Sequence, residues 1–465
     1  MMVTNKWFSC LITKRVSIAP LVIFRIIFGL MMAASTIRFG LKGWISELYI
    51  NPKFYFTFYG FDWVSPINSH FVIALFILLL LFSILICVGL FYRFSTISFF
   101  LIFTYIELID KTNYLNHYYF ISLISFLLIF LPANRLFSLD VFFKFCKLKT
   151  HIPAWTLNIL KFQIGVVYFF AGIAKLNYYW LIEAQPLINW LKHQTDLPLI
   201  GELMKYNETA YIFSWASALF DIAIVFILLN KKTRFFGYLL VVFFHTITSI
   251  MFPIGVFPLV MIASTLIFFS SKYHQKVISF LSFSSVNKFD NLNPINYNYS
   301  ANKTLTTIFS FYIFIQLLIP FRHLLYPGNL FWTEQGYRFS WRVMLIEKSG
   351  SAKFFIYDNK DRPLEIENCN ALESNYYLTP QQEKMMATQP DMILQYAKHL
   401  NKIYNDTILT ENNGTKIHLQ NPKVTVEAYV SLFNKGSRLF IDPKVNLAQI
   451  NRGLKNKEWI LPYED

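Results

Sequence analysis

The chain has 465 residues, of which 55% are hydrophobic, 19% are aromatic and only 15% are charged. Soluble globular proteins carry about 25% charged residues, so the composition excludes an ordinary soluble domain and predicts a membrane protein. The formal net charge is +15, but the basic residues gather in short loops between apolar runs, where they orient helices. We therefore expect no nucleic-acid partner.

Apolar runs recur through the first two thirds of the chain, many of them close to the roughly 20 residues that cross a bilayer as a helix. In chain order they cover residues 18–37, 71–92, 95–109, 118–132, 155–174, 210–229, 235–252, 256–269 and 305–320. The sequence thus predicts an all-α polytopic membrane bundle of about nine transmembrane helices within residues 1–325.

The basic residues also predict the orientation of the bundle. With the N-terminus in the cytoplasm, the inner loops collect most of the lysines and arginines, as the positive-inside rule requires. An odd number of spans then places the chain after residue 320 outside the cytoplasm. The composition, rich in Lys, Asn, Ile and Phe, is typical of bacteria, so we expect a protein of the bacterial inner membrane.

The composition changes near residue 326. Residues 353–358, 424–433 and 438–441 are short segments rich in Val, Ile, Phe and Tyr, which is typical of strands, and residues 381–404 predict one helix. We expect a C-terminal extracytoplasmic α+β domain over residues 326–465, which is large enough to bury its own core.

Common catalytic and metal-binding motifs do not occur in the sequence. The four cysteines have no CxxC spacing, and His245 has no second ligand at i+4, so we expect neither a disulfide framework nor a metal site. The chain also has no Gly-rich phosphate loop, nucleophile elbow or HExxH helix.

Ionisable side chains in or beside the apolar runs are the first candidates for function, because a charge buried in hydrocarbon must be paired or solvated. Glu107, Asp110 and Lys111 stand at the end of a run, and we interpret them as an interfacial loop. Arg25 and Asp221 keep two interpretations: they are mutual counter-ions, or they shape a cavity.

Lys175 ends the fifth run and also has two interpretations. A lysine at the end of a span commonly extends toward the lipid headgroups, and spacing alone favours this fate. The small residues Ala171, Gly172 and Ala174 would instead allow a neighbouring helix to approach closely, so that Lys175 faces the bundle. A lysine held in an apolar, water-poor pocket is a usable base near neutral pH.

Two histidines complete the set of candidates. His117 opens the fourth run on the same outer side as Lys175, where a lone histidine is more often an interfacial hydrogen-bonding residue than a catalyst. His245 lies in the middle of the seventh run, where a polar side chain should face the interior of the bundle. We therefore treat His245 as a pocket candidate.

Short motifs in a fixed order place these candidates in a family. The motifs are Phe24-Arg25-Ile26-Ile27-Phe28-Gly29, Asp110-Lys111-Thr112 with Asn116-His117, residues 168–176 around the lysine, Phe244-His245, Trp332-Thr333, Gly336-Tyr337 and Ser340-Trp341. In this order they resemble the vitamin K-dependent gamma-carboxylase family, whose membrane core is called the horizontally transferred transmembrane domain. The resemblance covers nearly the whole chain.

The resemblance implies a mechanism and a set of co-substrates. Lys175 would take a proton from vitamin K hydroquinone or menaquinol, O2 would add to the resulting anion, and the strong base so formed would remove a γ-proton from a glutamate, to which CO2 adds. The expected partners are membrane lipid, the quinone and a glutamate-containing peptide or protein. His117 matches the histidine of the carboxylation half, and the pocket candidates are His245, Asp221 and Arg25. The C-terminal domain motif is carried by Trp332, Thr333, Tyr337 and Trp341.

Two departures from the animal members leave the substrate open. They have a second lysine directly before the catalytic one, where this chain has Ala174, and they extend beyond its end with a part that helps to recognise a propeptide. A second hypothesis is a non-catalytic membrane protein of the same family that serves as an export or immunity partner and binds no quinone. A secondary transporter ranks third, because the sequence has no matched pair of broken helices.

Overall fold

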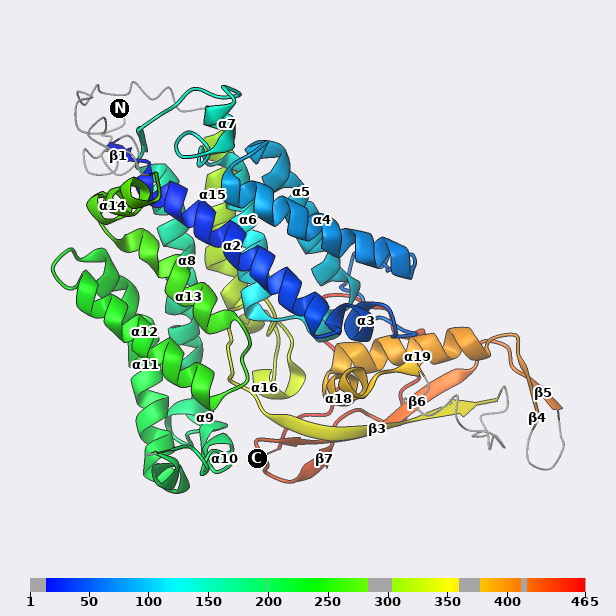
Figure 1. Cartoon of the computed structure of the whole chain (residues 1–465). Coiled ribbons are helices and arrows are strands. Elements are labelled where there is room, and N and C mark those ends of the chain that lie inside the picture. The colour runs from blue at the N-terminus through cyan, green and yellow to red at the C-terminus, as the bar shows by residue number, and fades with distance from the viewer. Residues whose placement is uncertain (1–13, 199, 283–302, 359–376, 411–415, 465) are drawn as a thin grey trace, which may run out of the picture.

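The computed structural model describes residues 14–198, 200–282, 303–358, 377–410 and 416–464. Within these residues, nine apolar helices form a bundle, and a smaller domain of strands and helices covers one end of it (Figure 1). We call this the domain end. We call the opposite end, where β1 (Arg15–Ser17) lies in Figure 1, the basic end, because Arg15 begins β1, Arg93 is in the first turn of α5 and Arg234 begins α12.

The bundle consists of α2 (Ala19–Leu41), α4 (Ser69–Val88), α5 (Tyr92–Ile109), α6 (Asn116–Phe130), α8 (Trp155–Lys175), α11 (Asn207–Leu229), α12 (Arg234–Met251), α13 (Phe257–Thr265) and α15 (Lys303–Leu318). Seven helices in the described part of the chain are long and apolar enough to cross a membrane: α2, α4, α5, α8, α11, α12 and the stretch Thr304–Leu325, which includes all of α15 but its first residue. The fourth and eighth predicted spans are the shorter helices α6 and α13.

Both short helices still lead from the domain end to the basic end. α6 begins where the Asn116 side-chain amide donates to the carbonyl oxygen of Arg342 at 3.1 Å, and the loop after it meets Arg25 through the carbonyl oxygen of Ala133. α13 continues as the 3₁₀ helix η3 (Leu266–Phe268), where Phe268 lies beneath the ammonium group of Lys161 in the first half of α8. The chain therefore alternates in direction through all nine helices.

The turn after α4 shows how local sequence fixes the helix ends. Asn68 caps the start of α4 by accepting the N–H of Phe71 at 2.8 Å. Gly89 ends it with a φ of +68°, which glycine adopts at little cost, and a Cβ there would overlap the guanidinium group of Arg25. The glycine thus lets this turn pack directly over a buried arginine.

The C-terminal domain is built on a three-stranded antiparallel sheet with the order β3 (Lys348–Tyr357), β6 (Lys423–Leu432) and β7 (Ser437–Leu439). These strands confirm the three predicted strand segments. The predicted single helix over residues 381–404 is wrong, because α18 (Pro380–Thr388) ends before α19 (Pro390–Tyr404) begins. Pro390 has no N–H to continue the first helix, and Gln389 before it is extended.

The domain packs tightly onto the bundle. One hydrophobic cluster joins Trp180 and Leu187, which follow α8, to Leu345 and Phe433 of the domain. The connecting elements at this end are α3 (Trp44–Tyr49), η1 (Lys111–Asn113), α9 (Tyr178–Leu181), α10 (Leu187–Leu191), η2 (Gly201–Lys205), η4 (Ile319–Leu325) and α16 (Leu330–Thr333). Burial of apolar surface therefore fixes the domain against the helix ends.

The remaining elements are peripheral. The domain also has a hairpin of β4 (Ile408–Thr410) with β5 (Lys416–His418) and a short helix η6 (Leu447–Gln449), and the basic end has α7 (Leu139–Phe142) and α14 (Ser271–Ser282). Two strands at the basic end, β1 (Arg15–Ser17) and β2 (His151–Pro153), pair in antiparallel fashion. The all-α prediction for the bundle missed them because three residues are too few to show a periodic pattern.

Candidate functional site

Lys175, the last residue of α8, points into the bundle and forms an ion pair with Asp221 of α11. Only 6% of the lysine and 4% of the aspartate are exposed. The ammonium group also lies 5.6 Å from the centre of the Trp180 ring. Of the two interpretations of Lys175, the one in which it extends to the headgroups is therefore wrong.

A glycine lets the two helices approach closely enough for this pair. A Cβ built on Gly172 would lie 2.6 Å from Cγ1 and 2.8 Å from the backbone N of Ile222, the residue after Asp221. Real Cβ atoms do not approach backbone this closely, so the contact of α8 with α11 requires glycine at this position. Lys175 lies one helical turn beyond Gly172 on α8, which brings it beside Asp221.

The pair borders a cavity of about 550 Å³. The walls come from α8, α11, α12 and α13 together with Trp180 of α9 and Leu187 of α10, and Val343 and Met344 of the domain complete them at the domain end. The polar side chains in the walls are Tyr168, Lys175, Ser217, Asp221, His245 and Thr248, and the other lining residues are aliphatic or aromatic. The volume is in the range of pockets for small organic ligands, and its apolar walls favour one that is itself largely apolar.

His245 faces this cavity, as predicted, and lies beside Tyr168. Its Nε2 is 2.8 Å from the hydroxyl oxygen of Tyr168, while its Nδ1 is buried and has no hydrogen-bond partner in the described residues. A buried ring nitrogen without a partner is costly, which marks this position as a place for a ligand group.

His117 does not line the cavity but lies behind one aromatic ring of its wall. The ring centroids of His117 and Phe257 are 5.8 Å apart, and those of Phe257 and His245 are 5.7 Å apart. His117 itself is buried. The structure thus places Lys175, Asp221 and His245 in one cavity and His117 one side chain away from it.

Arg25 lies elsewhere, near the basic end. Its guanidinium group donates to the carbonyl oxygens of Ala133 at 3.1 Å and Phe137 at 2.6 Å, both in the loop after α6. Asp221 pairs with Lys175 instead. Both interpretations of Arg25 are therefore corrected: it is not the counter-ion of Asp221, and it does not border their cavity. Its two terminal nitrogens donate instead to carbonyl oxygens of the loop after α6.

Family comparisons agree with this arrangement. The family model of the HTTM domain matches residues 13–273, which is more than half of the chain, and that of the vitamin K-dependent gamma-carboxylase lumenal domain matches residues 301–465. The chain belongs to the vitamin K-dependent gamma-carboxylase family. No solved structure matches it. The lumenal-domain match agrees with the topology in which the C-terminal region of this integral membrane protein is extracytoplasmic.

The motif residues of the carboxylase lumenal domain serve mainly as anchors. Trp332 is buried and donates its indole N–H to the carbonyl oxygen of Leu461 at 2.8 Å, while Trp341 stacks on Tyr119 of α6 with ring centroids 4.9 Å apart. The Thr333 hydroxyl accepts the N–H of Gln335 at 3.4 Å. Burial raises the pKa of Tyr337, which packs near Phe331. None of the four lines the cavity, but together they fix the segment that leads to Val343 and Met344.

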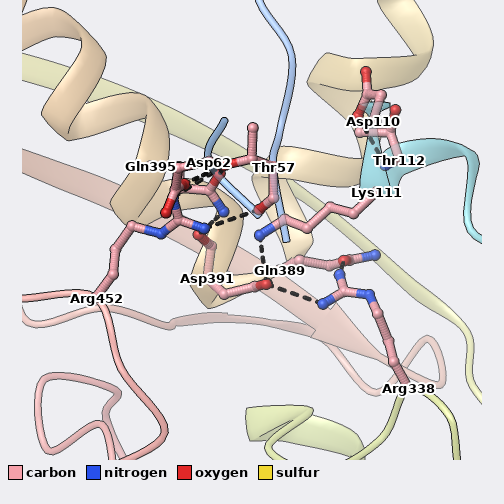
Figure 2. Close-up of polar contacts among 10 residues, drawn as sticks. All are labelled: Thr57, Asp62, Asp110, Lys111, Thr112, Arg338, Gln389, Asp391, Gln395 and Arg452. Carbon is pink, nitrogen blue, oxygen red and sulfur yellow. Dashed lines mark hydrogen bonds and ion pairs between the residues drawn. The ribbon is translucent and has the colours of Figure 1, made fainter. Parts of the chain in front are cut away.

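The interpretation of Glu107, Asp110 and Lys111 as an interfacial loop is right for Asp110 and Lys111, which lie in the connection between α5 and α6, but it is wrong for Glu107 and for the exposure of Lys111. Glu107 lies inside α5, and only 2% of Lys111 is exposed. Figure 2 shows Lys111 in a polar cluster where the two domains meet, ion-paired with Asp391 of the lumenal domain. The sequence holds one signal for this contact: Lys111 is a basic residue in an outer loop, and the positive-inside rule predicts few basic residues there. A charge in such a place needs a specific partner.

Metal binding finds no support in the described residues, because no group of three histidine, cysteine, aspartate or glutamate side chains comes together there. The groups suited to a co-substrate are those of the cavity instead. Lys175 and Asp221 offer a proton-exchanging pair, and His245 offers an unpaired ring nitrogen.

Proposed function

We propose that this chain is a quinol-dependent membrane enzyme of the bacterial inner membrane, with its N-terminus in the cytoplasm. Lys175 takes a proton from vitamin K hydroquinone or menaquinol, O2 converts the quinol into its epoxide, and the reaction is coupled to γ-carboxylation of a glutamate in a peptide or protein. The observation that carries the proposal is the Lys175 amine, paired with Asp221 in the wall of a largely apolar cavity.

The walls of the cavity suit a quinone that arrives through the bilayer. Ile212 and Leu219 of α11 and Phe243 of α12 line the cavity and are also exposed on the lipid-facing surface of the bundle. An isoprenoid tail can therefore extend between these helices while the ring lies near Lys175. Val343 and Met344 of the lumenal domain cover the cavity at the domain end.

The pairing of Lys175 with Asp221 explains how a buried lysine accepts a proton. Between them the amine and the carboxyl group share one ionisable proton, and the pair is neutral overall whether this proton is on nitrogen or on oxygen. A second proton, taken from the quinol, gives the pair one positive charge beside the quinol anion. Two opposite charges in a site of low dielectric attract each other strongly, so the pair favours deprotonation of the quinol.

The overall reaction balances with no further reductant. One quinol, one O2, one CO2 and one glutamate give one quinone epoxide, one water and one γ-carboxyglutamate, with release of one proton. The quinol is oxidised and O2 is reduced, and one oxygen atom enters the epoxide while the other leaves as water. The base that removes the γ-proton must be strong, and such a base survives only where the walls exclude water.

The proposal is tested with the purified protein in detergent, supplied with vitamin K hydroquinone, O2, labelled bicarbonate and a glutamate-containing peptide. Epoxide and fixed label are followed separately, and menaquinol replaces vitamin K hydroquinone in a parallel series. Both products are the expected result. Epoxide without label would restrict the activity to quinol oxygenation. The absence of both products would reject the proposal in favour of a non-catalytic membrane protein.

Substitution of His117 should affect carboxylation without affecting epoxidation. We expect His117→Ala to lower label incorporation about 100-fold or more, as loss of a positioned acid–base group does, while epoxide formation stays within about threefold. The control is His274→Ala, which removes another buried histidine at the basic end, where it bonds to the carbonyl oxygen of Ser270. Equal losses of epoxide and label in His117→Ala would contradict this role.

A further inference from the structure

One carboxylate joins three parts of the molecule where the two domains meet. Oδ2 of Asp391 lies 2.6 Å from Nζ of Lys111 and 2.9 Å from Nη1 of Arg338 (Figure 2). Lys111 belongs to the link between α5 and α6, Arg338 to the segment between α16 and β3, and Asp391 to the first turn of α19. We call these three residues the interdomain triad.

Beyond the triad, the two segments that carry its basic residues are bonded side by side. The hydroxyl of Tyr114 accepts the backbone N–H of Phe339 at 2.9 Å, and the amide of Asn116 donates to the carbonyl oxygen of Arg342 at 3.1 Å. Three successive connections therefore join residues 111–116 to residues 338–342. A shift of one segment must move the other.

Both bonded segments end at the cavity of Lys175. His117 directly follows Asn116, and it packs on the cavity wall through Phe257. Val343 and Met344 directly follow Arg342, and they are part of the wall itself. The position of the triad therefore determines where the carboxylation histidine and the lumenal cover of the cavity lie relative to Lys175.

The backbone of the second segment is strained. Phe339, Trp341 and Met344 have φ angles of +61°, +58° and +55°, in the left-handed region that residues with a Cβ avoid. Such a conformation is unfavourable for these residues, so it persists only while surrounding contacts impose it. Release of the triad would allow this segment to relax away from the cavity.

We infer that the interdomain triad is a latch that transmits the position of the lumenal domain to the active site, with Lys111 as a positioning residue for carboxylation. While α19 keeps its place, the latch holds His117 and the Val343–Met344 cover in the positions that carboxylation needs. The inference rests on the proposed function, since it divides that reaction into an epoxidation that does not need the latch and a carboxylation that does.

The first experiment compares Lys111→Met with Lys111→Arg. We expect Lys111→Met to lower the ratio of fixed label to epoxide about tenfold, chiefly through kcat for carboxylation, with epoxidation within about threefold, because misplacement of a reacting group by about 1 Å is costly. Lys111→Arg keeps the charge and should restore most of the ratio. An unchanged ratio in Lys111→Met would overturn the latch.

A second interdomain ion pair supplies the matched control. Lys435 of the lumenal domain contacts Glu183 of the membrane domain at 2.7 Å, and neither residue lines the cavity. Lys435→Met also removes an ion pair between the domains, with a lysine side chain that is more exposed than that of Lys111, and we expect wild-type ratios from it. If it lowered the ratio as much as Lys111→Met, general loosening of the domains would replace the latch as the explanation.

Hydrogen exchange tests the latch without any substrate. In Lys111→Met, the amides of residues 336–347 and 112–122 should exchange faster than in the wild type, while Lys435→Met should leave them unchanged. Unchanged exchange in Lys111→Met would overturn the latch even if the wild type formed no epoxide, whereas absence of epoxide alone would reject only the proposed function.

The ionisation of Lys111 adds a pH-dependent test. Burial lowers its pKa to about 8, against the opposing effect of Asp391, and Arg338 and Arg452 also face it. Although burial alone would raise the pKa of Asp391, Arg338 and Lys111 hold it well below its usual range, so the carboxylate stays charged. We expect the ratio of label to epoxide to fall between pH 7 and pH 9 in the wild type but not in Lys111→Arg. The same fall in both proteins would contradict a role of the Lys111 charge.

Discussion

Replacing Lys175 with methionine should lower epoxide formation about 100-fold or more, because a positioned general base contributes about 10²- to 10⁴-fold. Methionine keeps an unbranched apolar chain against Trp180, so the cavity wall stays filled while the amine is lost. The rate of epoxide formation from vitamin K hydroquinone, measured without peptide, is the direct readout. A rate within about threefold of the wild type would reject Lys175 as the base.

A second variant is needed as a control for stability, because removing one member of a buried ion pair leaves an uncompensated charge and destabilises a protein by about 3–5 kcal/mol. The double variant Lys175→Met with Asp221→Asn removes both charges and should unfold at a higher temperature than Lys175→Met alone. It should still form no epoxide. Recovery of activity in the double variant would show that the unpaired carboxylate, rather than the missing amine, caused the loss.

Lys161→Met is the matched control on the same helix. Lys161 lies about four turns before Lys175 on α8, and its ammonium group is 5.9 Å from the centre of the Phe268 ring, away from the cavity. Lys175→Met therefore removes an amine that borders the proposed quinol site, and Lys161→Met removes one that does not. We expect Lys161→Met to retain wild-type epoxidation.

The sequence predicted the helical bundle well because its signal is physical and local. Each apolar run must satisfy its own backbone hydrogen bonds in the bilayer, so a run of sufficient length predicts a helix whatever its neighbours are. The break at Pro390 was missed for the opposite reason. Most residues from 381 to 404 favour a helix, and the only local sign of the break is the missing N–H of Pro390.

The partners of the charged residues were harder to predict. Asp221 lies 46 positions after Lys175, and whether they meet depends on the rotation and spacing of α8 and α11, which periodicity does not specify. Arg25 seemed an equally good partner by charge alone, yet its position along α2 places it near the basic end. Charge inside a membrane shows that a partner exists without showing which residue it is.

The interdomain triad lay beyond any local pattern. Lys111 and Asp391 are separated by 280 positions, and they meet only because the lumenal domain folds back over the ends of α5 and α6. The motif Asp110-Lys111-Thr112 was nevertheless part of the family resemblance. Residues shared with a family but lacking an obvious local role are therefore worth testing as contacts between domains.

Substituting Gly172 with alanine should disrupt the site without removing any of its functional groups. The new methyl group would meet the backbone N of Ile222 at 2.8 Å, and a backbone atom in a packed helix cannot turn aside. We expect α8 and α11 to separate at the level of Lys175 and Asp221, with a destabilisation of about 1–3 kcal/mol, as overpacking usually costs. Both the unfolding temperature in detergent and the rate of epoxide formation should fall.

Gly165 provides the comparison, because it lies two turns earlier on the same face of α8 against the same helix. A Cβ there would meet only the Cγ1 of Val225, at 3.3 Å, and small adjustments of a side chain relieve such a contact. Gly165→Ala should therefore change the unfolding temperature and the epoxidation rate little. If Gly172→Ala behaved like Gly165→Ala, the close approach of α8 and α11 would not be what holds Lys175 against Asp221, and the pair would have to be maintained by the packing of Lys175 against Trp180 instead.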